Sequence, residues 1–286
     1  MARNLAIDLG TANTLVLSQG QDIVYRQPTV IAVHRQTGEV LAMGEEAWRM
    51  IGRTPSYIVA HRPLRSGAIT DFDMTEQMMR AIFHQVGVNR FNRPRVVICV
   101  PSALTLVEMR AVKLAARRAG AGQVLLMEQP IAAALGANLP IDKSVGNLIV
   151  DIGGGTTESG LISLGGVVAL EAERVGSFAI DDAVQRHLRE QYDIAVGEQT
   201  AEKIKVTVGS ALDVGEDRQM QVRGRRVSVS SPEVLKLSSG EIREAIAGPL
   251  RAILNSILNC VSNTPPELAN DFMDPFFRLA ALSRRS

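Results

Sequence analysis

The chain has 286 residues, of which 46% are hydrophobic and 21% are charged, and its formal net charge is +1. This composition is typical of a globular protein with one large or two medium domains, and the charge gives no support for a nucleic-acid partner. No secretory signal opens the chain and no apolar run of about 18 residues occurs, so we expect a cytoplasmic protein. Cys99 and Cys260 lie in apolar runs that indicate buried free thiols, and the four histidines lack the spacing of a zinc site.

The first part of the chain predicts strands and then a small inserted subdomain. Aliphatic residues bounded by turn residues predict strands at 4–9, 14–18 and 28–33. Residues 35–39 predict a hairpin turn that leads to a strand at 40–43, and residues 44–50 predict a short helix. We expect the more irregular segment 31–67 to form the inserted subdomain.

An alternation of helices and strands follows. An apolar face predicts a helix at 74–86, and residues 95–100 are nearly all apolar, as in a strand covered on both faces. Thr105 and Glu108 have the spacing of a capping box, which predicts that a helix starts there and leads to a strand at 123–127. Because the helix joins two strands, we expect those strands to be parallel.

The second part of the chain predicts a similar mixture of elements. Its patterns predict helices at 131–137, 179–191 and 198–208 and strands at 147–152 and 167–173. Residues 212–229 predict a β-rich insert with Gly224 and Arg225 at a turn. Ser238 and Glu241 predict another capping box, followed by one continuous helix to Val261.

Two segments repeat one pattern, which is an apolar strand ending near an aspartate, a glycine turn with hydroxyl residues, and a second apolar run. They are Ile7-Asp8-Leu9-Gly10-Thr11-Ala12-Asn13-Thr14 and Val150-Asp151-Ile152-Gly153-Gly154-Gly155-Thr156-Thr157. Glycine turns let backbone N–H groups approach phosphate oxygens, so the pair predicts two loops that hold one polyphosphate from both sides. Asp8 and Asp151 lie at strand ends, where carboxylates can hold a hydrated Mg²⁺. The alternative is two ordinary β-hairpins with glycine turns.

Glu128 is the candidate for catalysis. It follows an apolar strand and precedes an alanine-rich helix, so its carboxylate could orient or deprotonate an attacking water. The alternative is an acid that complements the dipole at a helix N-terminus. The Thr156 hydroxyl could contact a terminal phosphate or a metal-bound water, or Thr156 could simply favour a hairpin. Glu202 and Lys205 could contact a ribose or purine, or form a solvated pair on one helix.

Taken together, these motifs resemble the actin, Hsp70 and sugar-kinase superfamily and, more narrowly, the MreB family of bacterial actins. The likeness runs from residue 4 to about residue 271. The segments that carry it are the Asp8–Thr14 loop, Cys99-Val100-Pro101-Ser102, Glu128-Gln129-Pro130-Ile131-Ala132-Ala133-Ala134, the loop from Asp151 to Glu158, and Thr200-Ala201-Glu202 with Lys205.

The resemblance implies an α/β, actin-like ATPase fold with two RNase H-like domains, each carrying a small inserted subdomain. Domain I would comprise 1–137 with the insert 31–67, and domain II would comprise 138–271 with the insert 175–236. It implies a protein that binds ATP and Mg²⁺, forms filaments with itself, and works with the cell-wall elongation machinery at the inner membrane to maintain rod shape.

The resemblance also implies roles for single residues. Glu128 would position the hydrolytic water with help from Thr156, and Asp8 and Asp151 would serve the magnesium ion through water. Glu202 and Lys205 would line the nucleoside pocket. The phosphates would be held by Gly10, Thr11, Ala12, Asn13, Gly153, Gly154, Gly155 and Thr156.

The sequence departs from the family pattern in two places. Members often open with a short amphipathic membrane helix, which is absent here; Val88 and Phe91 could instead insert into a membrane beside Arg90 and Arg93, or fold back onto the core. After Asp271 the likeness ends in a divergent tail, 272–286, without glycine, so we expect a sheet strand and the adenosine loop to be missing and the C-terminal portion to be incomplete.

That tail keeps a second function open. The chain could be a truncated, non-catalytic protein that co-assembles with full-length filaments or inhibits them. A small-molecule kinase of the same superfamily is a further alternative, although the sequence contains no sugar-recognition insert. A chaperone is excluded because no peptide-binding domain follows.

Overall fold

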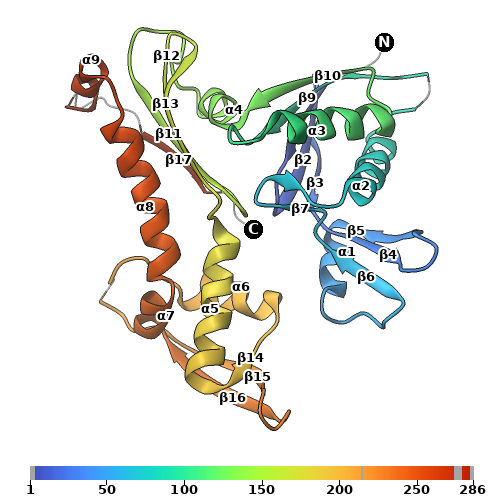
Figure 1. Ribbon diagram of the computed structural model, residues 1–286, viewed down its shortest axis with the longest axis vertical. Helices are drawn as coiled ribbons and strands as arrows, with labels where there is room; N and C mark the ends of the chain where they lie inside the picture. The colour runs from blue at the N-terminus through green and yellow to red at the C-terminus, as the bar shows by residue number, and fades with distance from the viewer. Residues whose placement is uncertain (1–3, 90, 214, 274–278, 284–286) are drawn as a thin grey trace. The chain divides into compact units, whose positions relative to one another are not determined.

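The computed structural model describes residues 4–89, 91–213, 215–273 and 279–283 (Figure 1). The chain divides into two compact units, which are described in turn. The first comprises Met1–Arg174 together with Asn259–Ser286, and the second comprises Val175–Leu258.

A five-stranded mixed sheet forms the first half of the first unit. Its order is β10-β9-β1-β2-β3, formed by β1 (Leu5–Leu9), β2 (Asn13–Ser18), β3 (Ile23–Pro28), β9 (Arg95–Val100) and β10 (Gln123–Glu128). The pairs β1–β9 and β9–β10 are parallel, as predicted, whereas β1–β2 and β2–β3 are antiparallel. Buried and half-buried residues alternate along β1, so one face of the strand packs into the core.

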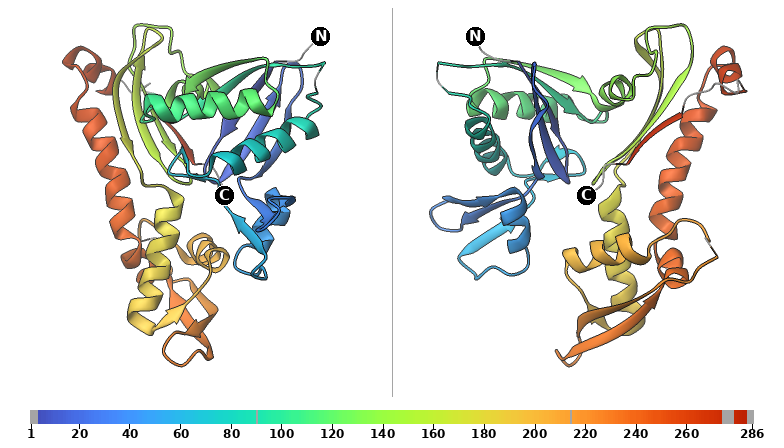
Figure 2. Two further views of the ribbon diagram at one scale, coloured as in Figure 1. Left: turned by 45° about the vertical axis from the view of Figure 1, so that its right-hand side comes forward. Right: turned by 180° about the vertical axis from the view of Figure 1, so that it is seen from behind.

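Helices α2 (Phe72–Gln85) and α3 (Leu106–Ala119) lie together against one face of this sheet (Figures 1 and 2). The buried face of α2 carries Met78, Met79, Ile82 and Phe83, and these side chains join the sheet residues in one hydrophobic core. The capping box predicted at the start of α3 is confirmed, because the Thr105 and Glu108 side chains each bond the other residue's backbone.

A three-stranded sheet and a short helix follow β3. β5 (Val40–Met43), β4 (Ile31–His34) and β6 (Ile58–His61) form the sheet, and α1 (Gly44–Met50) packs against it around Val30, Ala32, Ala42 and Ala47. The predicted single strand at 28–33 is wrong. β3 ends at Pro28 and β4 begins at Ile31, because Thr29 and Val30 turn from one sheet into the other.

A second four-stranded sheet completes the first unit. Its order is β13-β12-β11-β17, formed by β11 (Asn147–Ile152), β12 (Thr157–Ser163), β13 (Gly166–Glu173) and β17 (Leu279–Ser283). Helix α4 (Gln129–Gly136) precedes it and packs on β11 and β12.

The expectation that the chain lacks a further sheet strand after Asp271 is wrong. β17 pairs in parallel with β11, with Leu279 opposite Leu148. The chain reaches this edge through α9 (Pro266–Ala269) and η1 (Asn270–Met273), and Asp271 Oδ2 accepts a 2.7 Å hydrogen bond from the Gly146 backbone N–H. The tail contains no glycine, but its residues 279–282 are all apolar and form an edge strand by pairing with β11.

The second unit combines helices with a three-stranded sheet. Helices α5 (Ser177–Tyr192) and α6 (Glu198–Val208) pack on a sheet of order β14-β15-β16. The strands are β14 (Ile194–Ala195), β15 (Gln219–Arg226) and β16 (Pro232–Ser238). The predicted turn at Gly224 and Arg225 is wrong, since both residues lie inside β15 and pair with Glu233 and Pro232. A Cβ at Gly224 would lie 2.3 Å from Ile194, so close strand packing accounts for this glycine.

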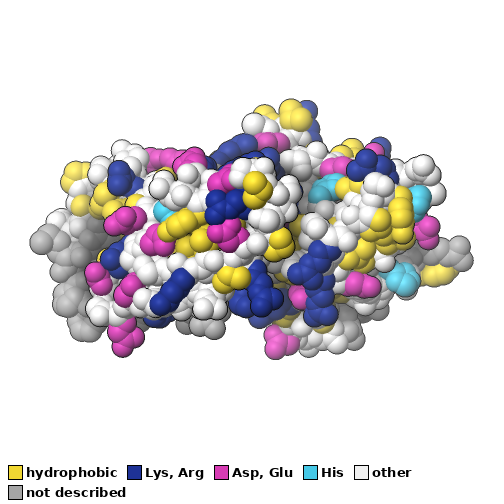
Figure 3. Space-filling model, turned by 90° about the horizontal axis from the view of Figure 1, so that it is seen from below, with side chains coloured by type: hydrophobic (Ala, Val, Ile, Leu, Met, Phe, Trp, Pro, Cys, Tyr) yellow, Lys and Arg dark blue, Asp and Glu magenta, His cyan; other side chains and the backbone are white. Residues whose placement is uncertain are grey.

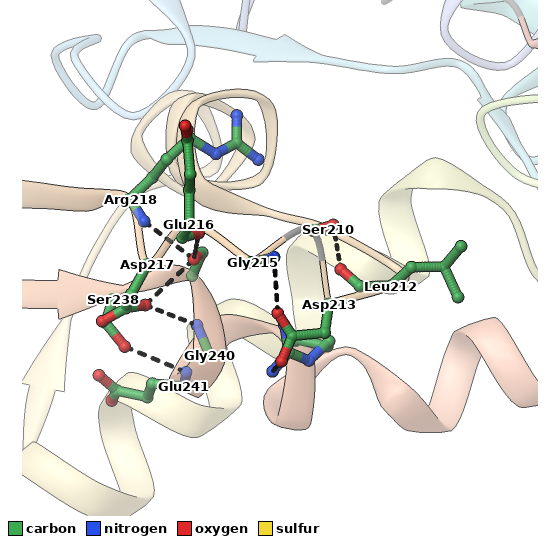
Figure 4. A network of polar contacts seen from close by, with 12 residues as sticks. Ser210, Leu212, Asp213, Gly215, Glu216, Asp217, Arg218, Ser238, Gly240 and Glu241 are labelled. Atoms are coloured by element: carbon green, nitrogen blue, oxygen red, sulfur yellow. Dashed lines mark hydrogen bonds and ion pairs between the residues drawn. The ribbon is translucent and has the colours of Figure 1, made fainter.

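The helix predicted to run unbroken to Val261 is divided in two. α7 (Ser239–Ala245) and α8 (Ala247–Ser262) meet at a bend of 58°. Ser238 Oγ accepts a bond from Glu241 N as predicted, whereas Glu241 Oε1 contacts His187 and Tyr192 rather than closing the box. Figure 4 shows the start of α7, where Asp217 Oδ1 accepts bonds from Ser239 Oγ and Gly240 N.

Among the described residues, no single helix is long and apolar enough to cross a membrane; only the bent pair α7–α8 passes by length and composition. On the face drawn in Figure 3, the basic, acidic and hydrophobic side chains of described residues are interspersed. That face therefore shows no patch of a single charge, in keeping with the net charge of +1.

Candidate functional site: a cavity lined by two glycine loops

Two β-hairpins carry the repeated motifs, as predicted. Residues 10–12 join β1 to β2, and residues 153–156 join β11 to β12. The second turn is closed by a 2.8 Å hydrogen bond from Gly153 N to Thr156 O. Each loop therefore presents short, glycine-containing backbone at the end of a buried strand.

Both loops line one cavity of about 550 Å³ in the first unit. The convergence expected from the repeated motif is therefore confirmed, and ordinary unrelated hairpins would not produce it. The predicted residues on its wall are Asp8, Gly10, Thr11, Ala12, Asn13, Asp151, Gly153, Gly154, Gly155 and Thr156. The wall also includes residues to which the sequence analysis gave no binding role, namely Leu9, Leu15, Arg26, Gly67, Pro101 and Gln129.

A tight turn between β7 (Leu64–Arg65) and β8 (Ala68–Ile69) lies against both loops. Gly67 N donates a 2.9 Å hydrogen bond to Thr11 Oγ1 in the first loop. A Cβ at Gly155, in the second loop, would lie 2.8 Å from the Ser66 backbone. Ser66 and Gly67 both have positive φ angles, 47° and 76°, which turn the backbone sharply at this point. The turn therefore sets the spacing of the two loops.

The first loop has a second support, from Thr29. The Thr29 side chain is fully buried, its Oγ1 donates a 2.7 Å bond to Gly10 O, and it lies 2.9 Å from Thr14 Oγ1. Thr29 N also donates to Ala12 O at 2.8 Å. Because Gly10 and Ala12 are held through their carbonyls, the loop is fixed from the side opposite its N–H groups.

Asp8 and Asp151 form the acidic part of the wall. Asp8 is half-buried and Asp151 is 3% exposed, and each lies one residue before the end of its strand. Carboxylates and hydroxyls beside a phosphate-sized glycine loop suit Mg²⁺, which prefers oxygen ligands and retains several waters. The donor set therefore fits a hydrated magnesium ion.

Glu158 is a buried acid beside this site. It lies next to the second glycine motif, but the sequence analysis gave it no role. It is 1% exposed, it lies opposite Asp151 in the sheet, and its Oε1 accepts a 2.8 Å bond from Ser102 N. Burial raises the pKa of Glu158 to about 7, the bond from Ser102 opposes the rise, and the negative charges of Asp151 and Glu128 add to it. The available sequence signal was its position directly after the two threonines that end the second glycine motif.

Glu128 is the N-cap residue of α4, and its side chain is exposed. It makes no side-chain capping bond, so the structure does not favour the local capping role over the catalytic one. The next residue, Gln129, is 6% exposed and lines the cavity, whereas Glu128 is not on its wall. The catalytic role of Glu128 stays a prediction.

Glu202 and Lys205 lie on α6 in the second unit. The alternative of a solvated helix pair is wrong, because Lys205 Nζ binds Asp181 Oδ2 of α5 at 2.9 Å and both side chains are largely buried. Burial raises the pKa of Asp181 to about 6, and the Lys205 ammonium opposes that rise. Lys205 thus ties α6 to α5.

The two apolar residues of the loop proposed for membrane contact, Val88 and Phe91, differ in their exposure to solvent. Val88 packs on the core of the first unit, whereas Phe91 is 85% exposed. Phe91 therefore does not fold back onto the core, and Val88 does not project outward. Arg90, expected beside them, lies outside the described residues.

Comparison with solved structures identifies the class of fold. MreB5 of Spiroplasma citri bound to AMPPNP matches with a TM-score of 0.91 and 34% identity, over 98% of this chain and 85% of that one. A MamK double helical filament matches with a TM-score of 0.76 at 18% identity, over 94% of this chain and 82% of that one. The protein has an actin-like fold.

Comparison with known sequences identifies the family. The chain is 44% identical to the cell shape-determining protein MreB of Escherichia coli K12 over 279 residues, which cover 96% of this chain and 80% of that protein. It is 39% identical to the cell shape-determining protein Mbl of Bacillus cereus over 274 residues, which cover 96% and 82%. The family described as MreB/Mbl protein matches residues 2–280, and the chain belongs to it. The expected end of the likeness at residue 271 is therefore wrong.

Proposed function

We propose that this protein is an ATP-binding, filament-forming bacterial actin homologue that organises cell-wall synthesis and maintains rod shape. The observation that carries the proposal is the single cavity lined by both glycine loops. The names of the MreB and Mbl relatives support the cellular role, and the Spiroplasma citri MreB5 structures bound to AMPPNP and ADP support a nucleotide in this cavity.

In this proposal the two loops bind the phosphates. The backbone N–H groups of residues 10–13 and 153–156 donate to phosphate oxygens. The phosphates can approach closely because Gly10, Gly153, Gly154 and Gly155 have no side chain. Asp8 and Asp151 hold magnesium through its waters. When bound, the ion neutralises charge on the transferred phosphate.

The hydrolytic step is assigned to Glu128 and Thr156. The Glu128 carboxylate orients the attacking water and accepts its proton, and the Thr156 hydroxyl, on the cavity wall, holds that water in place. Contact of Glu202 and Lys205 with the nucleoside stays a prediction of the resemblance, and Lys205 is bonded to Asp181 within the second unit. The exposed Phe91 provides a peripheral membrane contact where the filaments meet the cell-wall elongation machinery at the inner membrane.

A binding and turnover experiment tests this function. The purified chain should bind MgATP, assemble into filaments and release phosphate. Glu128→Ala should retain nucleotide but slow phosphate release by about 10²-fold or more, as expected for loss of a general base. Glu267→Ala, which removes an exposed acid from the first turn of another helix, is the matched control and should leave turnover unchanged.

The outcomes separate the two parts of the proposal. Unchanged turnover in Glu128→Ala would remove Glu128 from the mechanism and leave the binding function standing. A wild-type chain that binds no MgATP would contradict the function itself.

A further inference from the structure

The cavity wall carries one cationic side chain among the described residues, that of Arg26. Arg26 lies on β3 directly opposite Leu15 of β2, and both residues line the cavity. The neighbouring pair Tyr25 and Val16 points to the other face and is buried in the core. The two-residue period of the strands therefore fixes Arg26 on the cavity side.

The Arg26 guanidinium is available for a ligand. Its side chain is exposed, and it makes no hydrogen bond or ion pair with any other residue that the structure describes. Most other described arginines near this sheet are engaged; for example, Arg95 bonds Gln123 and Arg118 contacts Glu76. An arginine held at a cavity wall without a protein partner is suited to bind an anion, because its planar fork matches phosphate oxygens.

Charge balance favours the same conclusion. The wall contains two carboxylates, Asp8 and Asp151, against the single cation of Arg26. A nucleoside triphosphate brings about four negative charges to this wall, of which a magnesium ion balances two. A second cation that reaches the phosphates would reduce the remaining repulsion.

A competing role for Arg26 lies on its other side. Arg26 also borders a more open cavity with Glu45 and Glu46 of α1. Glu45 is already paired with Arg49 at 3.2 Å, and no ion pair joins Arg26 to Glu46 among the described residues. The geometry therefore favours the phosphate over a purely structural pairing with α1.

We propose that Arg26 binds the phosphate chain of the nucleotide and is a determinant of affinity for nucleoside polyphosphates. This inference rests on the nucleotide site proposed above, since it needs a polyphosphate in the cavity. It assigns to β3 a binding residue that neither glycine loop contains.

The test measures binding of MgATP and of adenosine, each by displacement of a fluorescent ATP analogue. Arg26→Gln should weaken MgATP about 10- to 100-fold, the range for a lost hydrogen-bonded charge contact, and leave adenosine unchanged. Arg26→Lys should recover part of the loss, because it keeps the charge without the fork. Arg95→Gln, on the same sheet but away from the cavity, is the control and should behave as wild type.

Any one of three other results would overturn the proposal. If Arg26→Gln binds MgATP as tightly as wild type, the phosphate role fails while the nucleotide site stands. If it weakens MgATP and adenosine equally, Arg26 acts on the structure rather than on phosphate. If the wild-type chain binds no MgATP, both this inference and the proposed function fail.

Discussion

Gly155→Ala is the substitution that most directly disturbs the spacing of the two loops. An added Cβ would lie 2.8 Å from both Cα and N of Ser66 and 3.0 Å from Thr11 Oγ1. Since the nearest atoms belong to backbone, no side-chain rotation relieves the contact. The Ser66–Gly67 turn must therefore move away from the second loop. This movement disturbs the hydrogen bond from Gly67 N to Thr11 Oγ1 in the first loop.

The size of the effect follows from the cost of overpacking a well-packed site, about 1–3 kcal/mol. For a unit of about 150–250 residues, each kcal/mol lowers Tm by about 2–4 °C, so we expect a fall of about 2–12 °C. If the same distortion must be reversed to bind the phosphates, the Kd for MgATP rises about 5- to 150-fold.

Thermal melts with and without MgATP measure both quantities. Gly136→Ala is the matched control, because it adds the same methyl group to open space at the end of α4 and should leave Tm and Kd nearly unchanged. A Gly155→Ala protein with wild-type Tm and wild-type Kd would refute the idea that the Ser66–Gly67 turn spaces the loops.

Two further predictions concern the supports of the site. Thr29→Val keeps the shape of the side chain but removes the hydroxyl that donates to Gly10 O. We expect the free energy of unfolding, measured by urea titration, to fall by about 1–3 kcal/mol. The control Thr207→Val changes an exposed threonine and should leave this free energy unchanged. Glu158 has a folded-state pKa of about 7, above its ordinary value of 4.5, so its protonated form stabilises the fold at low pH and that stability is lost as pH rises towards 7. In EDTA, Glu158→Gln should therefore raise Tm above wild type at pH 8 and match it near pH 4; a constant difference across this range would contradict the burial argument.

Local patterns were sufficient to predict the two hairpins that carry the glycine loops and several of the helices. The glycine turns predicted both hairpins, and the capping box predicted the start of α3, because each depends on residues within a few positions of one another. Helix α6 was predicted at its observed bounds, since its apolar positions Ala201, Ile204 and Val208 all face the core of the second unit.

The elements that were missed depend on tertiary contacts. β3 buries only Tyr25 and leaves Ile23 and Val24 about 40% exposed, so its sequence has no clean alternation. The break between α7 and α8 falls at Ile246, which is buried and keeps the helical spacing of apolar residues intact across the bend. The spacing of apolar residues indicates which positions are buried. From α7 to α8 the buried positions continue without interruption although the helix axis bends, so the spacing does not reveal the bend.

The same distinction applies to the site itself. The motifs predicted which backbone faces the cavity, but Thr29, the Ser66–Gly67 turn and the Ser102 N–H bond to Glu158 hold the loop strands from elsewhere in the chain. None of the three lies within a glycine loop, and each acts through a backbone hydrogen bond or a steric contact between residues far apart in the chain, which a local pattern does not reveal. It follows that substitutions at these supports should alter affinity while both glycine motifs remain intact, so an intact motif alone is insufficient evidence for an intact nucleotide site.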